Sequence, residues 1–87
     1  MLMKVADYQA NYLRSLPLHH SQKEEERAGD HAVFSYYLRP TFDFTQELLS
    51  MGDTVEVLEP ASLRSEMEQV GKEIAKHHRH LAKSSKR

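Results

Sequence analysis

Six histidines are the residues of this sequence best suited to chemistry, because an imidazole can bind a metal ion or transfer a proton near neutral pH. They are His19, His20, His31, His77, His78 and His80. His77 and His80 have the i, i+3 spacing that places two side chains on one face of a helix. A closed zinc site needs four ligands, and the chain has no cysteine to help complete one. We therefore expect no metal and no cofactor, and interpret the histidines as solvated or helix-terminal.

Covalent catalysis is also poorly supported. A nucleophilic serine needs a positioned turn and a neighbouring base. The sequence has no G-x-S-x-G motif, no glycine-rich phosphate loop and no convincing pair of catalytic carboxylates. The acidic run 24–26 is most simply a solvated turn. We predict that the chain is not an enzyme.

The basic residues are concentrated at the C-terminus. Between Lys72 and Arg87 there are six Lys or Arg residues and one acid, Glu73, although the net charge of the chain is only -1. Such a tail can bind phosphates. It can equally be a solvated helix end whose cations complement the helix dipole, and we favour this interpretation.

Aromatic residues could add a base-stacking surface. Phe34 and Tyr36 lie two apart in a predicted strand, as in sheets that bind RNA. Ala32 and Leu38 share that face, which is more typical of a core. A small nucleic-acid-binding domain that uses Tyr36, His19, His20 and the basic tail remains the alternative hypothesis.

The length of 87 residues predicts one domain, which we place at residues 1–83, followed by a frayed basic tail at 84–87. The absence of cysteine fits a reducing compartment. No apolar run approaches the roughly 18 residues of a membrane span, and the N-terminus lacks the apolar region of a signal peptide. We expect a soluble cytoplasmic protein. Its small core would gain stability from burial against a partner.

The first half of the chain has a helical pattern followed by strand patterns. Residues 4–15 are predicted to form a helix on the spacing of Val5, Tyr8, Tyr12 and Leu16. Residues 17–24 are ambiguous and fit an extended strand, with a polar turn at 24–30. Residues 32–39 alternate with a period of two and predict the clearest strand.

The second half has clearer boundaries. Residues 43–51 predict a helix, with Asp43 and Gln46 at capping-box spacing and Gly52 at its end. Residues 54–58 predict a strand, and Pro60 suits the first turn of a long helix over 60–80. That helix has one apolar stripe, which we expect to form an interface. Its members are Leu63, Met67, Val70 and Ile74.

These elements predict an α+β fold with helices on one face of a small sheet. The strands at 32–39 and 54–58 should be parallel and joined by a right-handed crossover. The predicted core is Tyr12, Phe34, Tyr36, Leu38, Phe44, Leu48, Val55, Val57, Leu63, Met67, Val70 and Ile74.

From about Tyr12 to His80 the sequence resembles the C-terminal extension, or WCX region, of bacterial WYL-domain transcriptional regulators. Three stretches carry the resemblance. Residues 18–23 are similar to an H-x-SQ stretch, residues 41–52 to a T-x-DF…ELLS-x-G helix, and residues 55–64 to a VEVLEP-x-x-LR strand and helix.

The resemblance implies a ferredoxin-like fold derived from a βαββαβ unit, and a role in dimer assembly and communication between domains. It implies that DNA is contacted only indirectly, through winged-helix and WYL domains that are not in this sequence. We expect the first strand of the fold to be missing, with the chain starting at the following helix. The function implied is a non-enzymatic oligomerisation and regulatory module that forms homo-oligomers.

Overall fold

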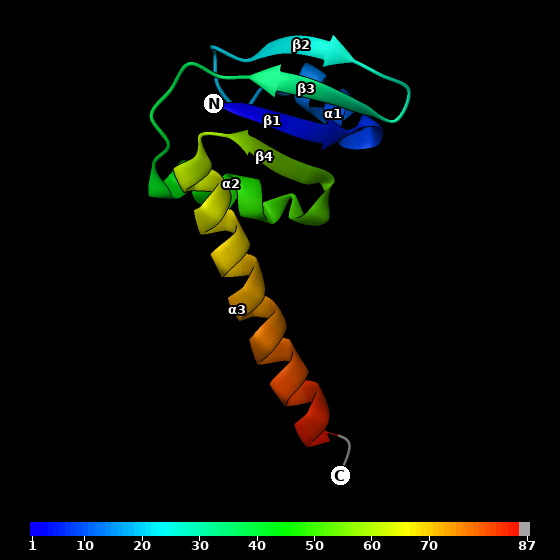
Figure 1. The fold of residues 1–87 in the computed structure, drawn as a ribbon. Helices are drawn as coiled ribbons and strands as arrows, with labels where there is room; N and C mark the ends of the chain where they lie inside the picture. The colour runs from blue at the N-terminus through cyan, green and yellow to red at the C-terminus, as the bar shows by residue number, and fades with distance from the viewer. Residues whose placement is uncertain (86–87) are drawn as a thin grey trace.

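A short strand at the N-terminus, β1 (Leu2–Ala6), occupies the interior of a four-stranded antiparallel sheet in the computed structural model (Figure 1). The structure describes the backbone of residues 1–85 and the side chains of residues 1–79. The expectation that the first strand is missing is therefore wrong. Residues 2–6 alternate between the two faces of the sheet, and Met3 and Val5 point into the core.

Helix α1 (Asp7–Ser15) begins where β1 ends, three residues later than predicted. Asp7 in the first turn and Arg14 in the last complement the helix dipole. The spacing of Val5 with Tyr8 and Tyr12 suggested one helical stripe, but Val5 belongs to the strand.

The next two strands, β2 (Lys23–Arg27) and β3 (His31–Ser35), form an antiparallel hairpin. The acidic run that we interpreted as a turn lies within β2, and β3 ends four residues earlier than predicted. β2 is an edge strand made only of charged residues. Charges on an edge strand discourage pairing with another chain.

Helix α2 (Phe42–Ser50) starts after Thr41, whose Oγ1 accepts a hydrogen bond from the backbone N–H of Phe44 at 3.3 Å. Thr41, and not Asp43, is therefore the N-cap. A 3-10 turn, η1 (Gly52–Thr54), leads into β4 (Val55–Glu59), and Gly52 has the positive φ of +62° predicted for it. The last helix, α3 (Ala61–Ser85), runs five residues past its predicted end. Residues 86–87 of the predicted frayed tail lie outside the described residues.

The order of strands in the sheet is β2-β3-β1-β4. Both β3 and β4 pair antiparallel with β1, so they run parallel to each other as predicted. They do not pair directly, because β1 lies between them and leaves no open slot. The elements follow one another as a β-α-β-β-α-β unit with a long helix added, which is an α+β fold.

The core lies between one face of the sheet and the helices. The predicted residues Phe34, Tyr36, Leu48, Val57 and Leu63 are buried in it. Leu38, Phe44, Val55 and Met67 are partly buried against them. Five buried hydrophobic residues are absent from the predicted core: Met3, Val5, Ala10, Leu13 and Ala32.

Two predicted core residues are exposed instead. Tyr12 lies on the outer side of α1 with 57% of its surface exposed, and Ile74 on α3 is 49% exposed. Val70 is half-buried and lies outside the core cluster.

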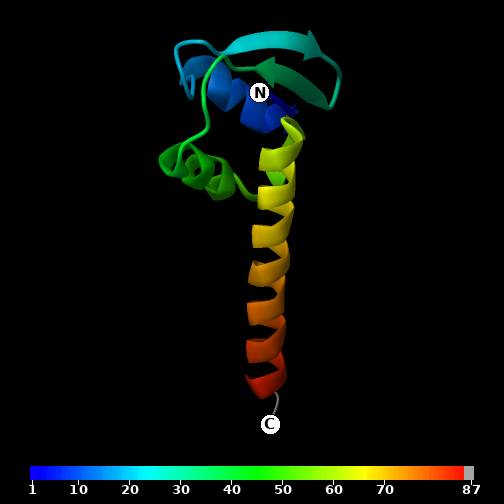
Figure 2. The ribbon, with the colours of Figure 1, turned by 60° about the vertical axis from the view of Figure 1, so that its left-hand side comes forward.

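Helix α3 projects away from the rest of the chain, and this gives the molecule its elongated shape of 49 × 27 × 19 Å (Figures 1 and 2). At 1.5 Å per residue its 25 residues span about 37 Å. Among the described side chains of α3, Leu63 is buried in the core and Met67 packs against it. Residues 71–79 are all exposed.

Candidate interaction groove

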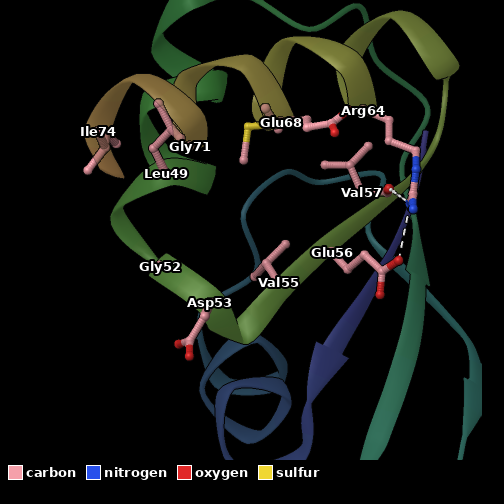
Figure 3. Close-up of a pocket in the computed structure, with 11 residues that line it drawn as sticks. Leu49, Gly52, Asp53, Val55, Glu56, Val57, Arg64, Glu68, Gly71 and Ile74 are labelled. Atoms are coloured by element: carbon pink, nitrogen blue, oxygen red, sulfur yellow. Dashed lines mark hydrogen bonds and ion pairs between the residues drawn. The ribbon is translucent and has the colours of Figure 1, made fainter. Parts of the chain in front are cut away.

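A groove lies between the end of α2, the outer edge of β4 and the side of α3 (Figure 3). Its volume is about 590 Å³. Its apolar lining comes from Leu49, Val55, Val57, Met67 and Ile74. Gly71 also lines it, and a Cβ at that position would have no atom within 4 Å apart from the adjacent backbone of its own helix. Along α3 the groove extends from Arg64 to Ile74, a rise of about 15 Å.

The charged residues of the groove are mostly acidic. Asp53, Glu56 and Glu68 line it together with one cation, Arg64. Glu68 also forms an exposed i, i+4 pair with Lys72, with 3.6 Å between Nζ and Oε2. Exposed pairs of this kind are weak. The groove therefore combines an apolar lining with an acidic rim.

Arg64 connects the groove to the edge of the sheet. Its Nη1 donates hydrogen bonds to the carbonyl oxygen of Val57 at 2.7 Å and to Oε2 of Glu56 at 3.1 Å (Figure 3). β4 pairs only with β1, so its other side is a free strand edge. Because Arg64 occupies a carbonyl at the middle of that edge, the edge is obstructed for the addition of another strand.

The predicted interface residues on α3 do not all have the same surroundings. Leu63 is only 3% exposed and is buried in the core of its own chain, so it is not available to a partner. Met67 and Val70 are half-buried, and Ile74 is half-exposed. From residue 74 to residue 79 the helix carries Lys76 and Arg79 and no acidic residue.

A comparison of the sequence with known protein families identifies the family of the chain. The family model described as the WCX domain matches residues 2–75. The chain belongs to the WCX domain family. No curated protein matches it. The WCX domain is the C-terminal module of WYL-type regulators, as the three quoted sequence stretches indicated, and these regulators are not an enzyme family.

The H-x-SQ stretch of this WCX domain lies in a loop and forms hydrogen bonds with α1 and with the residues that follow β3. The side-chain amide of Gln22 makes three hydrogen bonds. Its Oε1 accepts from the Tyr36 hydroxyl at 2.6 Å and from the N–H of Leu18 at 3.1 Å, and its Nε2 donates to the carbonyl of Leu13 at 2.9 Å. Burial raises the pKa of the Tyr36 hydroxyl, which remains a hydrogen-bond donor. The amide therefore has a structural role that its sequence context did not show.

The neighbouring residues of this stretch are also structural. Oγ of Ser21 accepts a hydrogen bond from the N–H of Tyr37 at 2.9 Å, and Nδ1 of His19 lies 2.7 Å from the same Oγ. The rings of His19 and His20 have centroids 4.1 Å apart. Within residues 1–79 these two imidazoles are not joined by a third potential metal ligand.

The other histidines of the WCX domain are dispersed. His31 lies beside Asp30, with 2.8 Å between Nδ1 and Oδ1, and this hydrogen bond lowers the pKa of the Asp30 carboxyl. Nδ1 of His78 lies 2.8 Å from the carbonyl oxygen of Ile74, and His77 is exposed on α3. The side chain of His80 lies outside the described residues. Within residues 1–79 no three potential ligands are grouped to hold a metal.

The burial of two aromatic residues bears on the nucleic-acid hypothesis. Phe34 and Tyr36 are 1% and 3% exposed beneath the helices, so neither can stack on a base. In the described part of the chain no helix has the length and apolar composition needed to cross a bilayer.

A second apolar surface was not predicted. Tyr8, Tyr12 and Leu16 lie at i, i+4 and i+8 along α1 and are 70%, 57% and 59% exposed. The core uses the opposite face of this helix, through Ala10 and Leu13. The sequence of α1 has apolar residues on both faces at helical spacing. Residue type alone therefore did not show which of the two faces is buried.

Proposed function

We propose that this WCX domain is a non-enzymatic oligomerisation and regulatory module of a bacterial WYL-type regulator. The observation that carries the proposal is an apolar groove that continues onto the exposed side of a projecting helix. Contact with DNA would be made through winged-helix and WYL domains that are not among these 87 residues. Such a regulator would act in the cytoplasm.

The exposed part of α3 supports self-association. A helical segment with no tertiary contacts is marginally stable in water, because most helix stability in proteins comes from packing of an apolar face. Residues 71–79 lack such packing within one chain, although Ile74 continues the stripe that begins at Leu63 and Met67. Association would bury this stripe and fill the groove beside it.

Sedimentation equilibrium of the 87-residue chain tests the proposal. We expect a dimer or a higher oligomer at micromolar concentration. The matched variant Ile74→Glu places a charge on the exposed stripe, and its dissociation constant should rise. A wild-type chain that remains monomeric at about 100 µM, a concentration at which an affinity of about −8 kcal/mol would give mostly dimer, contradicts the proposal.

No observation now favours the nucleic-acid hypothesis over this one. Its aromatic residue, Tyr36, is buried, whereas the exposed His20 and the basic tail that begins at Lys72 remain available. The nucleic-acid hypothesis can be tested by measuring the affinity for single-stranded DNA at increasing salt concentration. Binding through phosphates would weaken steeply with salt, with a slope set by the number of phosphates neutralised.

A further inference from the structure

We propose that the groove is filled by the C-terminal half of α3 from a second copy of this chain, so that two α3 helices cross antiparallel near Gly71. The inference rests on the proposed function and specifies its geometry. Each copy would supply one groove and one helix end, and the two contacts would be identical by two-fold symmetry.

Charge complementarity identifies the occupant. The groove is lined by Asp53, Glu56, Glu68 and Arg64, which leaves an excess of negative charge although Glu56 pairs with Arg64 and Glu68 forms an exposed pair with Lys72. Its complement is an apolar segment that carries positive charge. Residues 74–79 of α3 provide one large apolar side chain, Ile74, together with Lys76 and Arg79, and contain no acid.

The charge along α3 favours antiparallel pairing. Between residues 61 and 73 the helix has three acids and two cations, and between 74 and 79 it has two cations and no acid. Parallel helices would place the two basic halves side by side. An antiparallel pair places each basic half beside the acidic half and groove of the other copy, which is favourable in both contacts.

Gly71 suits the crossing point. It lies on the groove side of α3 and has no atom of its own chain near the place of a Cβ. A glycine inside a helix costs about 1 kcal/mol relative to alanine unless something uses the space it leaves. With the symmetry axis near residue 71, Met67 of each copy lies beside residues 74–78 of the other. A strand is a poorer occupant of the groove, because Arg64 obstructs the edge of β4.

A charge-swap experiment tests the pairing. The tail variant Lys76→Glu/Arg79→Glu and the groove variant Asp53→Lys/Glu68→Lys should each raise the dimer dissociation constant about tenfold or more. An equimolar mixture should form a heterodimer nearly as tight as the wild-type dimer, because both contacts are then again between opposite charges. The matched control is Lys23→Glu/Arg27→Glu on β2, at the other edge of the sheet, which changes the net charge as much as the tail variant does. It should leave the dissociation constant within about threefold.

Cysteine cross-linking tests the direction of the helices, and the chain has no cysteine of its own. Gly71→Cys should form a disulfide with its counterpart under mild oxidation. His77→Cys should not, because antiparallel helices crossing at residue 71 separate the two copies of residue 77 by about 18 Å. Equal cross-linking at both positions would indicate a parallel pair and overturn the proposal.

The outcomes separate this inference from the proposed function. If the wild-type chain is a dimer but the tail variant behaves like the β2 control, the antiparallel pairing is wrong and another surface mediates association. If the wild-type chain is monomeric at about 100 µM, both proposals fail. Circular dichroism of each variant establishes that it is folded, and Gly71→Leu gives a further test. A Cβ at this exposed position meets no neighbouring atom within 4 Å, so the variant should fold and yet dimerise at least about tenfold more weakly.

Discussion

The side chain of Gln22 should contribute more to stability than any one of its hydrogen bonds does, because it is the partner of three groups: Leu13 in α1, Leu18 in the loop after α1, and Tyr36 directly after β3. The substitution Gln22→Ala removes the partners of the Tyr36 hydroxyl, the Leu18 N–H and the Leu13 carbonyl together. Each bond contributes about 1 kcal/mol net, and a buried polar group left without a partner costs about 1–3 kcal/mol. Tyr36 is only 3% exposed, so water cannot readily replace the lost acceptor. We expect Gln22→Ala to lower the free energy of unfolding by about 2–4 kcal/mol.

The partner substitution should have a smaller effect. Tyr36→Phe removes one hydrogen bond but leaves Oε1 of Gln22 bonded to the Leu18 N–H, so we expect a loss of about 1 kcal/mol. In the double variant no hydroxyl is left unpaired. Its loss should therefore be smaller than the sum of the two single losses by about 1 kcal/mol or more.

Urea unfolding at one fixed protein concentration measures these differences, because association would make stability depend on concentration. In a chain of this size a loss of 1 kcal/mol also lowers the melting temperature by about 4–8 °C. Gln69→Ala on the exposed side of α3 is the matched control and should change stability by less than about 0.5 kcal/mol. Strictly additive losses, or equal losses for Gln22→Ala and Gln69→Ala, would refute the assigned role of the amide.

Three further predictions concern the fold. Leu48→Ala should cost about 2–5 kcal/mol in urea unfolding, because Leu48 is fully buried, whereas Leu49→Ala on the groove should cost clearly less; equal losses would misplace the core. Thr41→Ala should cost about 1 kcal/mol by removing the N-cap of α2, and Thr41→Ser should restore most of it. The hydrogen bond from Arg14 lowers the pKa of the Glu24 carboxyl, so its contribution to stability is present above the ordinary value of 4.5 and is lost as pH falls below it. The wild-type chain should therefore lose more stability than Glu24→Gln between about pH 5 and pH 3, and parallel pH profiles would contradict this assignment.

The second half of the fold could be predicted from local signals. Gly52 ends α2 with a positive φ, and Pro60 directly precedes α3. Leu48, Val57 and Leu63 are buried as their periodicity indicated. These elements are regular, and glycine and proline mark their boundaries.

The first half depended on pairing that no local pattern reveals. β2 is a strand of charged residues, which has low intrinsic preference for a sheet. It forms because it pairs with β3 and because Glu24 makes an ion pair with Arg14 of α1, with 2.7 Å between Nη2 and Oε2. β1 was overlooked because five residues carry only two and a half periods of alternation, and Val5 also fits the spacing of the helix that follows. Both errors concern strands whose stability comes from contacts with distant residues.

The groove could not be predicted from the sequence, for a related reason. Leu49 and Met67 come from separate elements, and only the path of η1 and β4 brings them to one surface. The stripe of α3 was visible, but its division into a buried first turn and an exposed continuation depends on where the sheet ends. Leu63 and Ile74 belong to the same apolar stripe in the sequence, but in the structure Leu63 is buried in the core and Ile74 is half-exposed.

The position of β1 also changes the physical argument for association. A missing first strand would have left unpaired backbone groups between β3 and β4, and a partner strand could have filled them. β1 pairs with both neighbours, so the sheet offers no such gap. On the β4 side of the sheet, the surfaces that remain open are the edge of β4, where Arg64 occupies a backbone carbonyl, and the exposed length of α3. The groove beside β4 therefore offers apolar side chains and negative charge to a partner, rather than free backbone hydrogen-bonding groups. A helix with a basic end complements such a surface better than a strand does.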